Sequence, residues 1–576
     1  MSGRFFTRTI LLVVMLVTVA TAGRPTFAAD SRVEAARGMV VSVSAPASEV
    51  GRDVLRAGGN AVDAAVATAF ALAVTWPSAG NIGGGGFMMV YSGAGQRPVC
   101  VEYRETAPAA AHARTLEKHS AMTGHLVCGT PGTVAGMALA HRTYGKRPWG
   151  ELVMPAVRLA RDGVVVNPAL ASSLNGALRS SKEFAELQRA FAPPTGKEWR
   201  AGDRLVQPEL ARTLERIAQE GPRAFYTGAI ADQLVAEMQA GGGLITKQDL
   251  AGYQAHVREP IHGTYRGYDV YGPPPPSSGG TCLVEMLNIL ENFQVADAPA
   301  AASGTATATT WSARSLHLVV EAMRRAFCDR ARWLGDADFV KIPPHLTTKE
   351  YARDVARQID LQRATPSELL AADIPLAAES SETTHFSVID RNGMAVANTY
   401  TLENSYGCRV VVRGAGFLLN NEMTDFNRVP GRTDRKGMIG TPANQIAPGK
   451  RMLSSQTPTL VLRDGRLVLV TGSPGGRTII NTVLCTVIQI VDFQRDARAA
   501  VDAPRLHHQW FPDRVGFEGL DRPEYAAAVA ELRRMGHEFP EKSGKQGDAH
   551  SIGVDPQTGR SQGAPDRRID GHAASE

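Results

Sequence analysis

The sequence contains little cysteine, few aromatic residues and little excess charge for its length. Its 576 residues include six cysteines and 6% aromatic residues, and 62 basic residues stand against 57 acidic ones. No two cysteines form a Cys-x-x-Cys pair, so neither a zinc knuckle nor a dithiol redox motif is indicated. The net charge of +5 includes no dense Lys/Arg block, and nothing therefore points to a nucleic-acid groove.

Long hydrophobic runs are also lacking, except near the N-terminus. Arg4 and Arg8 precede an apolar run over residues 10–20, and small residues follow as far as Ala29. The run is shorter than the ~20 apolar residues of a spanning helix, so residues 1–28 are predicted to be a secretory signal peptide. We therefore expect an exported protein, periplasmic or secreted, with no membrane span after signal removal. An uncleaved N-terminal anchor is the alternative.

Export bears on the cysteines, because oxidising compartments permit disulfide bonds. The sequence leaves open whether any of them pair. They are even in number and widely spaced, at Cys100, Cys128, Cys282, Cys328, Cys408 and Cys485.

The remaining composition is typical of a folded globular protein. With 43% hydrophobic and 21% charged residues, the chain can bury a sizeable core. Periodicity and turn residues predict strands together with many helices, and therefore an α+β or layered fold. The expected elements are a helix over 61–74 capped by Asn60, mostly helix over 133–249, strands at 265–271 and 467–470, a hairpin of 385–390 and 394–402 around Asn392-Gly393, a helix over 479–491, and loops at 298–315 and 367–382.

Three local patterns favour ordinary structural roles. Gly83–Gly86 lacks both phosphate-binding glycine patterns, so tight backbone packing is the better interpretation. Leu453–Gln456 contains two serines, but the chain has no Gly-x-Ser-x-Gly elbow. His507 and His508 are adjacent, and neighbours on a strand point to opposite faces, so no metal is expected there.

Thr383 lies where the expected 367–382 loop meets the hairpin. A threonine at such a boundary is usually just a good strand former. It gains chemistry if the peptide bond before it is cut, because the new α-amine, with a pKa of about 7.7–8.0, can act as a base for its own hydroxyl. The backbone N–H groups of Gly475 and Gly476, in a glycine turn after a strand, are suited to stabilise an oxyanion.

The ordered motifs of this chain resemble those of the γ-glutamyltransferases, or γ-glutamyl transpeptidases, which are N-terminal nucleophile hydrolases. The resemblance runs from about Met39 to about His508. It is carried by Gly58–Ala65, Gly80–Phe87, Tyr103–Pro108, Gly129–Thr133, Pro274–Gly280, Thr383–His385, Leu453–Ser455 and Thr471–Gly476.

The resemblance implies a four-layer αββα sandwich made as one self-cleaving proenzyme. Cleavage is expected between Glu382 and Thr383, giving a large subunit of residues 29–382 and a small catalytic subunit of residues 383–576. The two subunits are expected to stay together as a heterodimer with one shared core. Their number per assembly is left open.

By the same resemblance, Thr383 is the nucleophile that takes a γ-glutamyl group from glutathione or a related donor and passes it to water or an amine. Thr401 matches the residue whose hydroxyl supports the nucleophile, and Gly475 and Gly476 match the oxyanion donors. Further matches imply which residues bind the α-carboxylate of the γ-glutamyl group and which lie beside its α-amine. They are Arg104, Ser454 and Ser455 for the carboxylate, and Glu403, Glu422 and Asp425 for the amine. No cofactor is implied, since all these groups are protein groups.

Some positions depart from the common family pattern. Glu403 and Glu422 stand where many members have Asn and Gln, and Lys436 stands where several bacterial members have an aromatic residue on a lid, here expected over Pro430–Gly449. Three alternatives remain beside the γ-glutamyl enzyme: an acylase for glutaryl-cephalosporin-like amides, a transpeptidase for poly-γ-glutamate, and a secreted binding protein that never cleaves.

Overall fold

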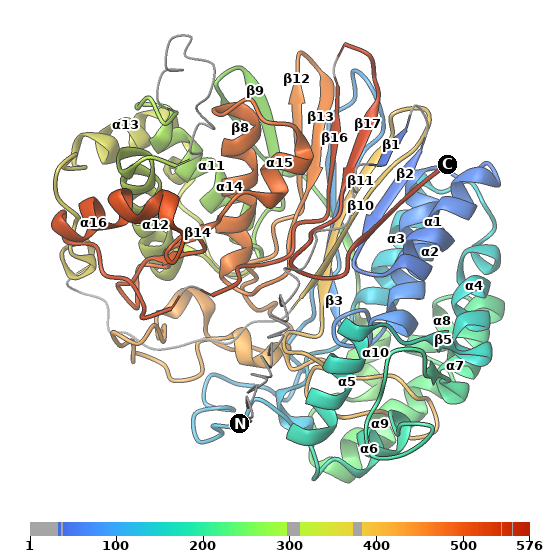
Figure 1. Cartoon of the computed structure of the whole chain (residues 1–576). Helices are drawn as coiled ribbons and strands as arrows, with labels where there is room; N and C mark the ends of the chain where they lie inside the picture. Colours follow the sequence, from blue (N-terminus) through green and yellow to red (C-terminus); the bar gives the residue numbers. More distant parts are fainter. Residues whose placement is uncertain (1–32, 36–37, 297–310, 372–382, 543, 556) are drawn as a thin grey trace, which may run out of the picture.

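The computed structural model describes residues 33–35, 38–296, 311–371, 383–542, 544–555 and 557–576. The predicted signal peptide 1–28, Glu382 and most of the two expected loops lie outside these residues. Two large antiparallel sheets pack face to face, with helices on both outer sides (Figure 1). The chain therefore has the expected four-layer αββα architecture.

The two sheets are named here after one strand each, the β10 sheet and the β13 sheet. The β10 sheet has the order β18 (His572–Ser575), β2 (Met39–Ser42), β10 (Thr384–Ile389), β11 (Ala395–Thr401), β3 (Gly85–Tyr91), β4 (Val99–Glu102) and β7 (His256–Arg258). The β13 sheet has the order β1 (Val33–Ala35), β17 (Ser561–Ala564), β16 (Ser551–Val554), β13 (Arg466–Thr471), β12 (Thr459–Arg463), β9 (Tyr268–Gly272) and β8 (Ile261–Tyr265). Two small ribbons pair β5 (Val164–Val165) with β6 (Arg204–Leu205) and β14 (Leu506–His507) with β15 (Gly516–Phe517).

The helices divide by the sheet they cover. On the β10 side lie α1 (Ala45–Arg56), α2 (Ala61–Thr75), α3 (Thr133–Tyr144), α4 (Trp149–Asp162), α5 (Pro168–Ser180), α6 (Ala185–Ala190), α7 (Pro208–Glu220), α8 (Arg223–Tyr226), α9 (Ala229–Gly241) and α10 (Lys247–Gly252). On the β13 side lie α11 (Gly279–Leu290), α12 (Ala313–Trp333), α13 (Lys349–Arg357), α14 (Thr478–Val491), α15 (Ala497–Asp502) and α16 (Ala526–Arg534). Short 3-10 turns are η1 (His125–Val127), η2 (Pro344–Thr347), η3 (Ser367–Leu370), η4 (Glu422–Asp425), η5 (Pro442–Asn444) and η6 (Pro523–Tyr525).

Strand β3 shows why the layers form. Its residues are all buried, because one face meets the opposite sheet and the other meets helices. Phe87 and Met89 belong to the core between the sheets, whereas Met88 and Val90 pack in the core under α2. Side chains alternate between the two faces of a strand, so a continuous apolar run is needed where both faces are covered.

Helix α2 is the centre of one helical layer, and the sequence predicts it closely. Asn60 accepts a hydrogen bond from the Asp63 backbone N–H, and the Asp63 carboxylate accepts one from the Asn60 N–H in return. This reciprocal cap sets where the helix begins. Every residue of α2 is buried, as expected for a helix that is apolar on all sides.

Two expected elements differ from the structure. The predicted strand 265–271 is a hairpin of β8 and β9, because the chain turns at Arg266 and Gly267. Both residues have positive φ, 50° and 82°. This is the hairpin-turn geometry that Asn-Gly or Gly-Gly usually signals. Because arginine is not one of these residues, the sequence contains no signal for the turn. Of the expected loop 298–315, the last part caps and begins α12, where Ser312 accepts from the Ser315 N–H.

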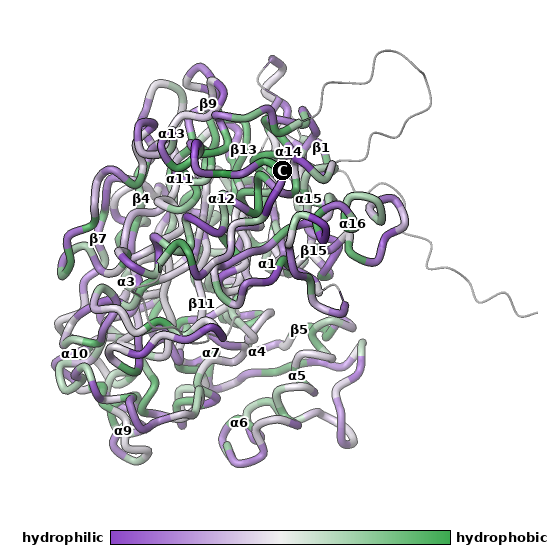
Figure 2. Tube along the Cα trace, turned by 90° about the vertical axis from the view of Figure 1, so that its left-hand side faces the viewer, coloured by the Kyte–Doolittle hydropathy of each residue, from purple (hydrophilic) through white to green (hydrophobic). Residues whose placement is uncertain are grey.

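Hydrophobic segments run through the middle of the molecule, and hydrophilic segments are frequent at its edge, for example around α16 (Figure 2). Among the described residues, none of the helices combines the length and the hydropathy required to cross a bilayer.

A polar strip crosses the otherwise apolar space between the two sheets. His385 Nδ1 lies 2.8 Å from Thr399 Oγ1, and His385 Nε2 lies 3.0 Å from Ser387 Oγ. The Ser387 hydroxyl donates at 2.7 Å to the backbone oxygen of His550, which directly precedes β16 of the other sheet. Buried polar groups that find partners in this way add little cost, and they tie the sheets together at one register.

His550 should make the stability of the fold depend on pH. Burial lowers its pKa to about 4, so below pH 6.5 the unfolded chain binds a proton that the folded protein does not. This contribution is present above pH 6.5 and is lost as the pH falls toward 4. The substitution His550→Asn removes this contribution. The free energy of unfolding of the wild type, relative to that of the variant, should therefore fall by about 3 kcal/mol from pH 7 to pH 4. Denaturant unfolding at both pH values measures it, and an unchanged difference would contradict the lowered pKa.

Candidate active site

Thr383 and Thr401 lie side by side at one end of the β10 sheet. The hairpin predicted at Asn392-Gly393 is present as β10 and β11, and Thr384 pairs with Tyr400. Continuing this antiparallel register by one residue places Thr383 opposite Thr401. The Thr401 hydroxyl accepts from the Glu403 N–H at 2.7 Å. Two hydroxyl groups 18 residues apart in the sequence are thus held together by strand pairing.

A glycine turn approaches the same place from the β13 sheet. Strand β13 ends at Thr471 and α14 begins at Thr478. Between them, Gly475 and Gly476 have φ of 125° and 56°, conformations that favour glycine. A Cβ on Gly475 would lie 2.4 Å from Thr478 Oγ1, so a larger residue is also excluded by space. The turn lies directly before the start of α14.

One small cavity brings most of the predicted site residues together. It is lined by Thr383, Thr401, Gly476, Arg104, Glu403, Asp425, Ser454 and Ser455, together with Gln456, Arg477 and Ile479. Gly475 instead lines a neighbouring cavity with Pro474 and Thr478, and Glu422 lies just behind the wall, in contact with Arg104. The residues come from the ends of both sheets and from the loops that follow them.

Ser454 and Ser455 are held by groups that the sequence did not point to. The Ser278 hydroxyl donates to the Ser454 backbone oxygen at 2.7 Å. Arg330 on α12, which is buried, donates from Nη2 to Ser455 Oγ at 2.9 Å and from Nε to Ser278 Oγ at 2.9 Å. The block Pro274–Gly280 was visible in the sequence and could have pointed to Ser278. Arg330 carries no local signal, because it reaches the site from the opposite helical layer.

Arg104 is the cation at the centre of the cavity wall. Only 1% of it is exposed, and its Nη1 lies 2.6 Å from Glu422 Oε2 and 3.6 Å from Glu105 Oε2. Its Nη2 contacts Asp425 as an ion pair. Burial lowers the pKa of Arg104, but the surrounding carboxylates outweigh burial and raise it. The predicted carboxylate binder and the predicted amine-side residues are therefore direct neighbours, not opposite walls.

The carboxylates around Arg104 are not equivalent. Burial raises the pKa of Glu105 to about 8 and raises that of Glu422 well above its ordinary value, despite the nearby guanidinium. Burial disfavours the charged form of both carboxyl groups, and the Arg104 guanidinium opposes this effect. Asp425 is more exposed, with 10% of its side chain accessible, and it lines the cavity.

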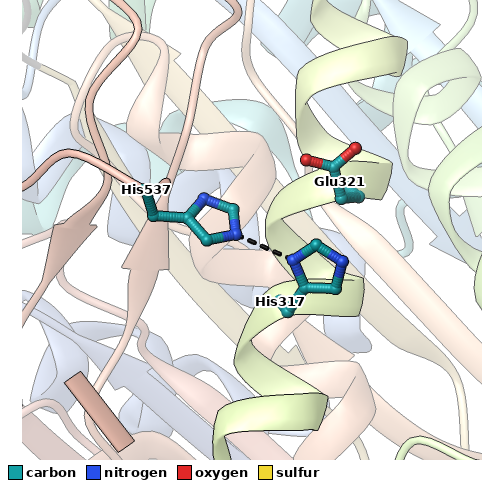
Figure 3. A group of neighbouring side chains, drawn as sticks. All are labelled: His317, Glu321 and His537. Carbon is teal, nitrogen blue, oxygen red and sulfur yellow. Dashed lines mark hydrogen bonds between the residues drawn. The ribbon is translucent and has the colours of Figure 1, made fainter. Parts of the chain in front are cut away.

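Two groups of described residues have metal-ligand composition. His317 and Glu321 on α12 approach His537, with His317 Nδ1 2.8 Å from His537 Nε2 (Figure 3). Glu321 is already bound by Arg324 and Arg325, so we interpret the group as a buried polar network. The second group, Glu403, Glu422 and Asp425, has the Arg104 guanidinium in the place of a cation.

The expected lid, Pro430–Gly449, connects to the glycine turn through Arg477. Arg477 lines the cavity and donates from Nη1 to the Gly437 backbone oxygen at 3.1 Å. Lys436 is exposed, and its backbone N–H is bound by Asp434. The loop is thus attached beside the site, while Lys436 points its charge to solvent.

The comparisons with known proteins agree with one another. A family model for Gamma-glutamyltranspeptidase matches residues 47–576. The chain is 46% identical over 544 residues to the glutathione hydrolase proenzyme of Escherichia coli (strain K12), covering 93% of this chain and 91% of that protein. It is 35% identical over 552 residues to the acylase ACY 1 proenzyme of Pseudomonas sp. (strain SE83), covering 93% of each. The solved structure of cephalosporin acylase from Bacillus halodurans superposes with a TM-score of 0.83 at 26% identity, covering 97% of this chain and 99% of that one.

The four layers and their structural relatives define the class of this protein, an N-terminal nucleophile hydrolase. Both the fold and the enzyme class expected from the sequence are confirmed. More narrowly, the chain belongs to the gamma-glutamyltranspeptidase family, whose model covers most of its length.

Proposed function

We propose that this chain is an exported proenzyme that cleaves itself before Thr383 and then transfers γ-glutamyl groups from glutathione or related donors to water or amines. The observation that carries the proposal is the cavity in which Thr383, Thr401 and Gly476 meet Arg104 and Asp425. It combines an acyl-transfer centre with charges of both signs suited to an α-amino acid. No residue in it needs a metal or a cofactor to act.

Maturation is expected to use the Thr383 hydroxyl and the peptide bond that precedes Thr383. The Thr383 hydroxyl attacks the carbonyl carbon of Glu382, and the peptide C–N bond breaks as the Thr383 amine leaves. The resulting ester is hydrolysed by water, which gives the chains 29–382 and 383–576 and frees the Thr383 hydroxyl. The new α-amine then stands next to that hydroxyl and can accept its proton during each later attack.

Turnover follows the same chemistry on the donor. Thr383 Oγ attacks the γ-carbonyl, the amine leaves, and a γ-glutamyl ester remains until water or an acceptor amine takes it. The backbone N–H groups of Gly475 and Gly476 stabilise the oxyanion, and preorganised donors of this kind contribute about 3 kcal/mol each. Thr401 positions the nucleophile through the strand pairing that holds the two residues together.

Recognition of the α-amino acid end uses the Arg104 cluster. The guanidinium with the Ser454 and Ser455 hydroxyls binds the α-carboxylate, since the planar fork of arginine matches two oxygens. Asp425 and Glu403 bind the α-ammonium. The carboxylate and the ammonium of the ligand are attached to the same carbon atom. The residues that bind these two groups therefore have to be neighbours, as Arg104 and Asp425 are.

The first experiment is intact mass and N-terminal sequencing of the purified protein. A chain of residues 383–576 beginning at Thr383 is expected, together with release of the cysteinylglycine part of glutathione on incubation. A folded protein that remains one chain and releases nothing would support the binding-protein alternative and contradict the proposal.

The acylase alternative rests on the high TM-score to cephalosporin acylase. It predicts that a glutaryl amide, which lacks the α-ammonium, is a better donor than the matching γ-glutamyl amide. We expect the reverse, because Asp425 and Glu403 both line the cavity and an acyl group without an ammonium leaves them without a ligand. Competing the two amides in one assay separates these functions.

The substitution Glu403→Asn replaces the acidic residue of this chain with the asparagine that many family members have at this position. Glu403 has a φ of 74°, and asparagine is among the residues that tolerate this conformation, so the fold should be kept. We expect the KM for a γ-glutamyl amide to rise about fivefold, the equivalent of about 1 kcal/mol for one lost charge interaction. The KM for the glutaryl amide should not rise. Equal changes for both donors would contradict contact between Glu403 and the ammonium.

A further inference from the structure

Two cysteines that are 280 residues apart in the sequence meet in the core. Cys128 Sγ lies 3.3 Å from Cys408 Sγ, and the two side chains are 1% and 0% exposed. Cys128 precedes the proposed cleavage position at Thr383 and Cys408 follows it. The pair therefore lies across the contact between the two proposed subunits.

Backbone hydrogen bonds hold the two cysteine segments in place. The Gly124 N–H donates to the Cys408 backbone oxygen at 2.8 Å, and the Cys408 N–H donates to the Leu419 oxygen at 3.0 Å. Beside Cys128, the Gly129 N–H donates to Asn420 Oδ1 at 2.8 Å. Both segments are thus fixed to the same stretch, so the sulfur contact does not depend on a mobile side chain.

The other cysteines have different surroundings. Cys282, Cys328 and Cys485 each direct their sulfur to a backbone oxygen, at 3.7 to 3.9 Å. All are buried. Cys282 and Cys485 provide controls, because they share the burial of Cys128 and Cys408 and each directs its sulfur to a backbone oxygen.

We propose that Cys128 and Cys408 form a disulfide bond that covalently joins the large and small subunits of the exported enzyme. A disulfide has a sulfur separation of about 2 Å, so the two sulfurs, which lie 3.3 Å apart, have to approach by about 1 Å. The bond itself requires only export. Its role as a link between two chains also rests on the proposed cleavage before Thr383.

The oxidant is a protein disulfide of the exporting compartment. One cysteine thiolate attacks this disulfide and forms a mixed disulfide, releasing one thiolate of the oxidant. The second cysteine thiolate then attacks the sulfur of the first, forming the Cys128–Cys408 bond and expelling the second oxidant thiolate. The pair loses two electrons and two protons, and the oxidant is reduced to a dithiol.

Burial determines when the bond forms and how long it lasts. Burial and the contact with Cys408 raise the pKa of the Cys128 thiol well above its ordinary value, so the folded protein contains little thiolate to react. Oxidation therefore precedes closure of the core. Once formed, the bond is shielded from outside thiols, including that of glutathione, because attack requires access to a sulfur.

The bond would also anchor a loop of the candidate active site. Cys408 lies in a segment in which Glu403, Tyr406 and Arg409 all have positive φ, from 58° to 74°. Such backbone persists only where the surroundings hold it. A covalent link beside Cys408 keeps this segment, with the cavity residue Glu403, attached to the large subunit after cleavage.

The test is electrophoresis of protein isolated from the export compartment with its free thiols blocked by an alkylating agent. Without reductant, the processed wild type should run as one band of the full mature size, and reductant should separate it into two. The variants Cys128→Ala and Cys408→Ala should each give two bands without reductant. The control Cys282→Ala should behave like the wild type.

Peptide mapping keeps the disulfide separate from the cleavage. A linked pair of peptides containing Cys128 and Cys408, lighter by two hydrogens than the two reduced peptides, is expected even if the chain proves to be uncut. If the protein runs as one uncut chain both with and without reductant, the proposed cleavage is contradicted but the disulfide is not. Recovery of both cysteines as alkylated peptides would overturn the disulfide, whether or not the chain is processed.

Discussion

Thr383→Ala is expected to leave the chain uncut and to abolish turnover. The methyl group offers no oxygen to attack the Glu382 carbonyl, so the ester that leads to cleavage cannot form. Without cleavage there is no α-amine to act as base, and the nucleophile itself is missing. Loss of a nucleophile in acyl-transfer enzymes typically costs about 10⁴-fold or more in kcat. Gel electrophoresis and release of a chromogenic amine from a γ-glutamyl anilide measure the two effects.

Two controls show whether the effect belongs to the hydroxyl of Thr383. Thr383→Ser restores an oxygen at the same position and should again be processed and active, although at altered rates. Thr384→Ser changes the adjacent residue, which is buried in β10 and points to the other face of the strand, and should leave processing intact. Normal processing of Thr383→Ala would assign the nucleophile to another residue.

Asp425→Asn is expected to weaken γ-glutamyl donors strongly while sparing glutaryl donors. The substitution keeps the size of the side chain but removes its charge, which we place against the α-ammonium. Hydrogen bonds to charged groups contribute about 1.5–3 kcal/mol, which corresponds to a loss of about 10- to 150-fold in kcat/KM. Most of it should appear in KM, since the ammonium is bound in the ground state as well as in the transition state.

The matched donor pair provides the control for this variant. A glutaryl amide has no ammonium, so its kcat/KM should be unchanged or improved by Asp425→Asn. Processing should continue, because Thr383 and the glycine turn are untouched, and Arg104 retains Glu422 as an ion-pair partner. An equal loss for both donors would indicate that Asp425 acts by holding Arg104 and not by contact with the ligand.

The cluster around Arg104 gives a physical reason for preferring one donor class. A glutaryl acyl group brings a carboxylate but no cation to the aspartate, whereas a γ-glutamyl group brings both. Glu105 and Glu422 are fully buried beside Arg104, whereas Asp425 and Glu403 line the cavity. We therefore expect selectivity for the α-ammonium to depend mainly on Asp425 and Glu403.

The sequence allowed the hairpin and the glycine turn to be predicted because their signals are local. Asn392-Gly393 marks the turn that sets the β10–β11 register, and that register alone brings Thr383 to Thr401. In contrast, the β8–β9 turn was missed because Arg266 occupies a position where glycine or asparagine is the usual signal. Local patterns are reliable only where the residue types are the ones that the backbone geometry prefers.

The sequence by itself indicated the family and most of the elements, and it predicted a junction at Thr383, because these depend on ordered motifs and on periodicity along the chain. The tertiary structure alone decided which distant groups meet: Arg330 with Ser455, Arg104 with Glu422 and Asp425, and Cys128 with Cys408. These pairs join separate layers or loops, and no short-range pattern records them. Their contacts arise from the packing of two sheets and their helices, which brings together residues hundreds of positions apart.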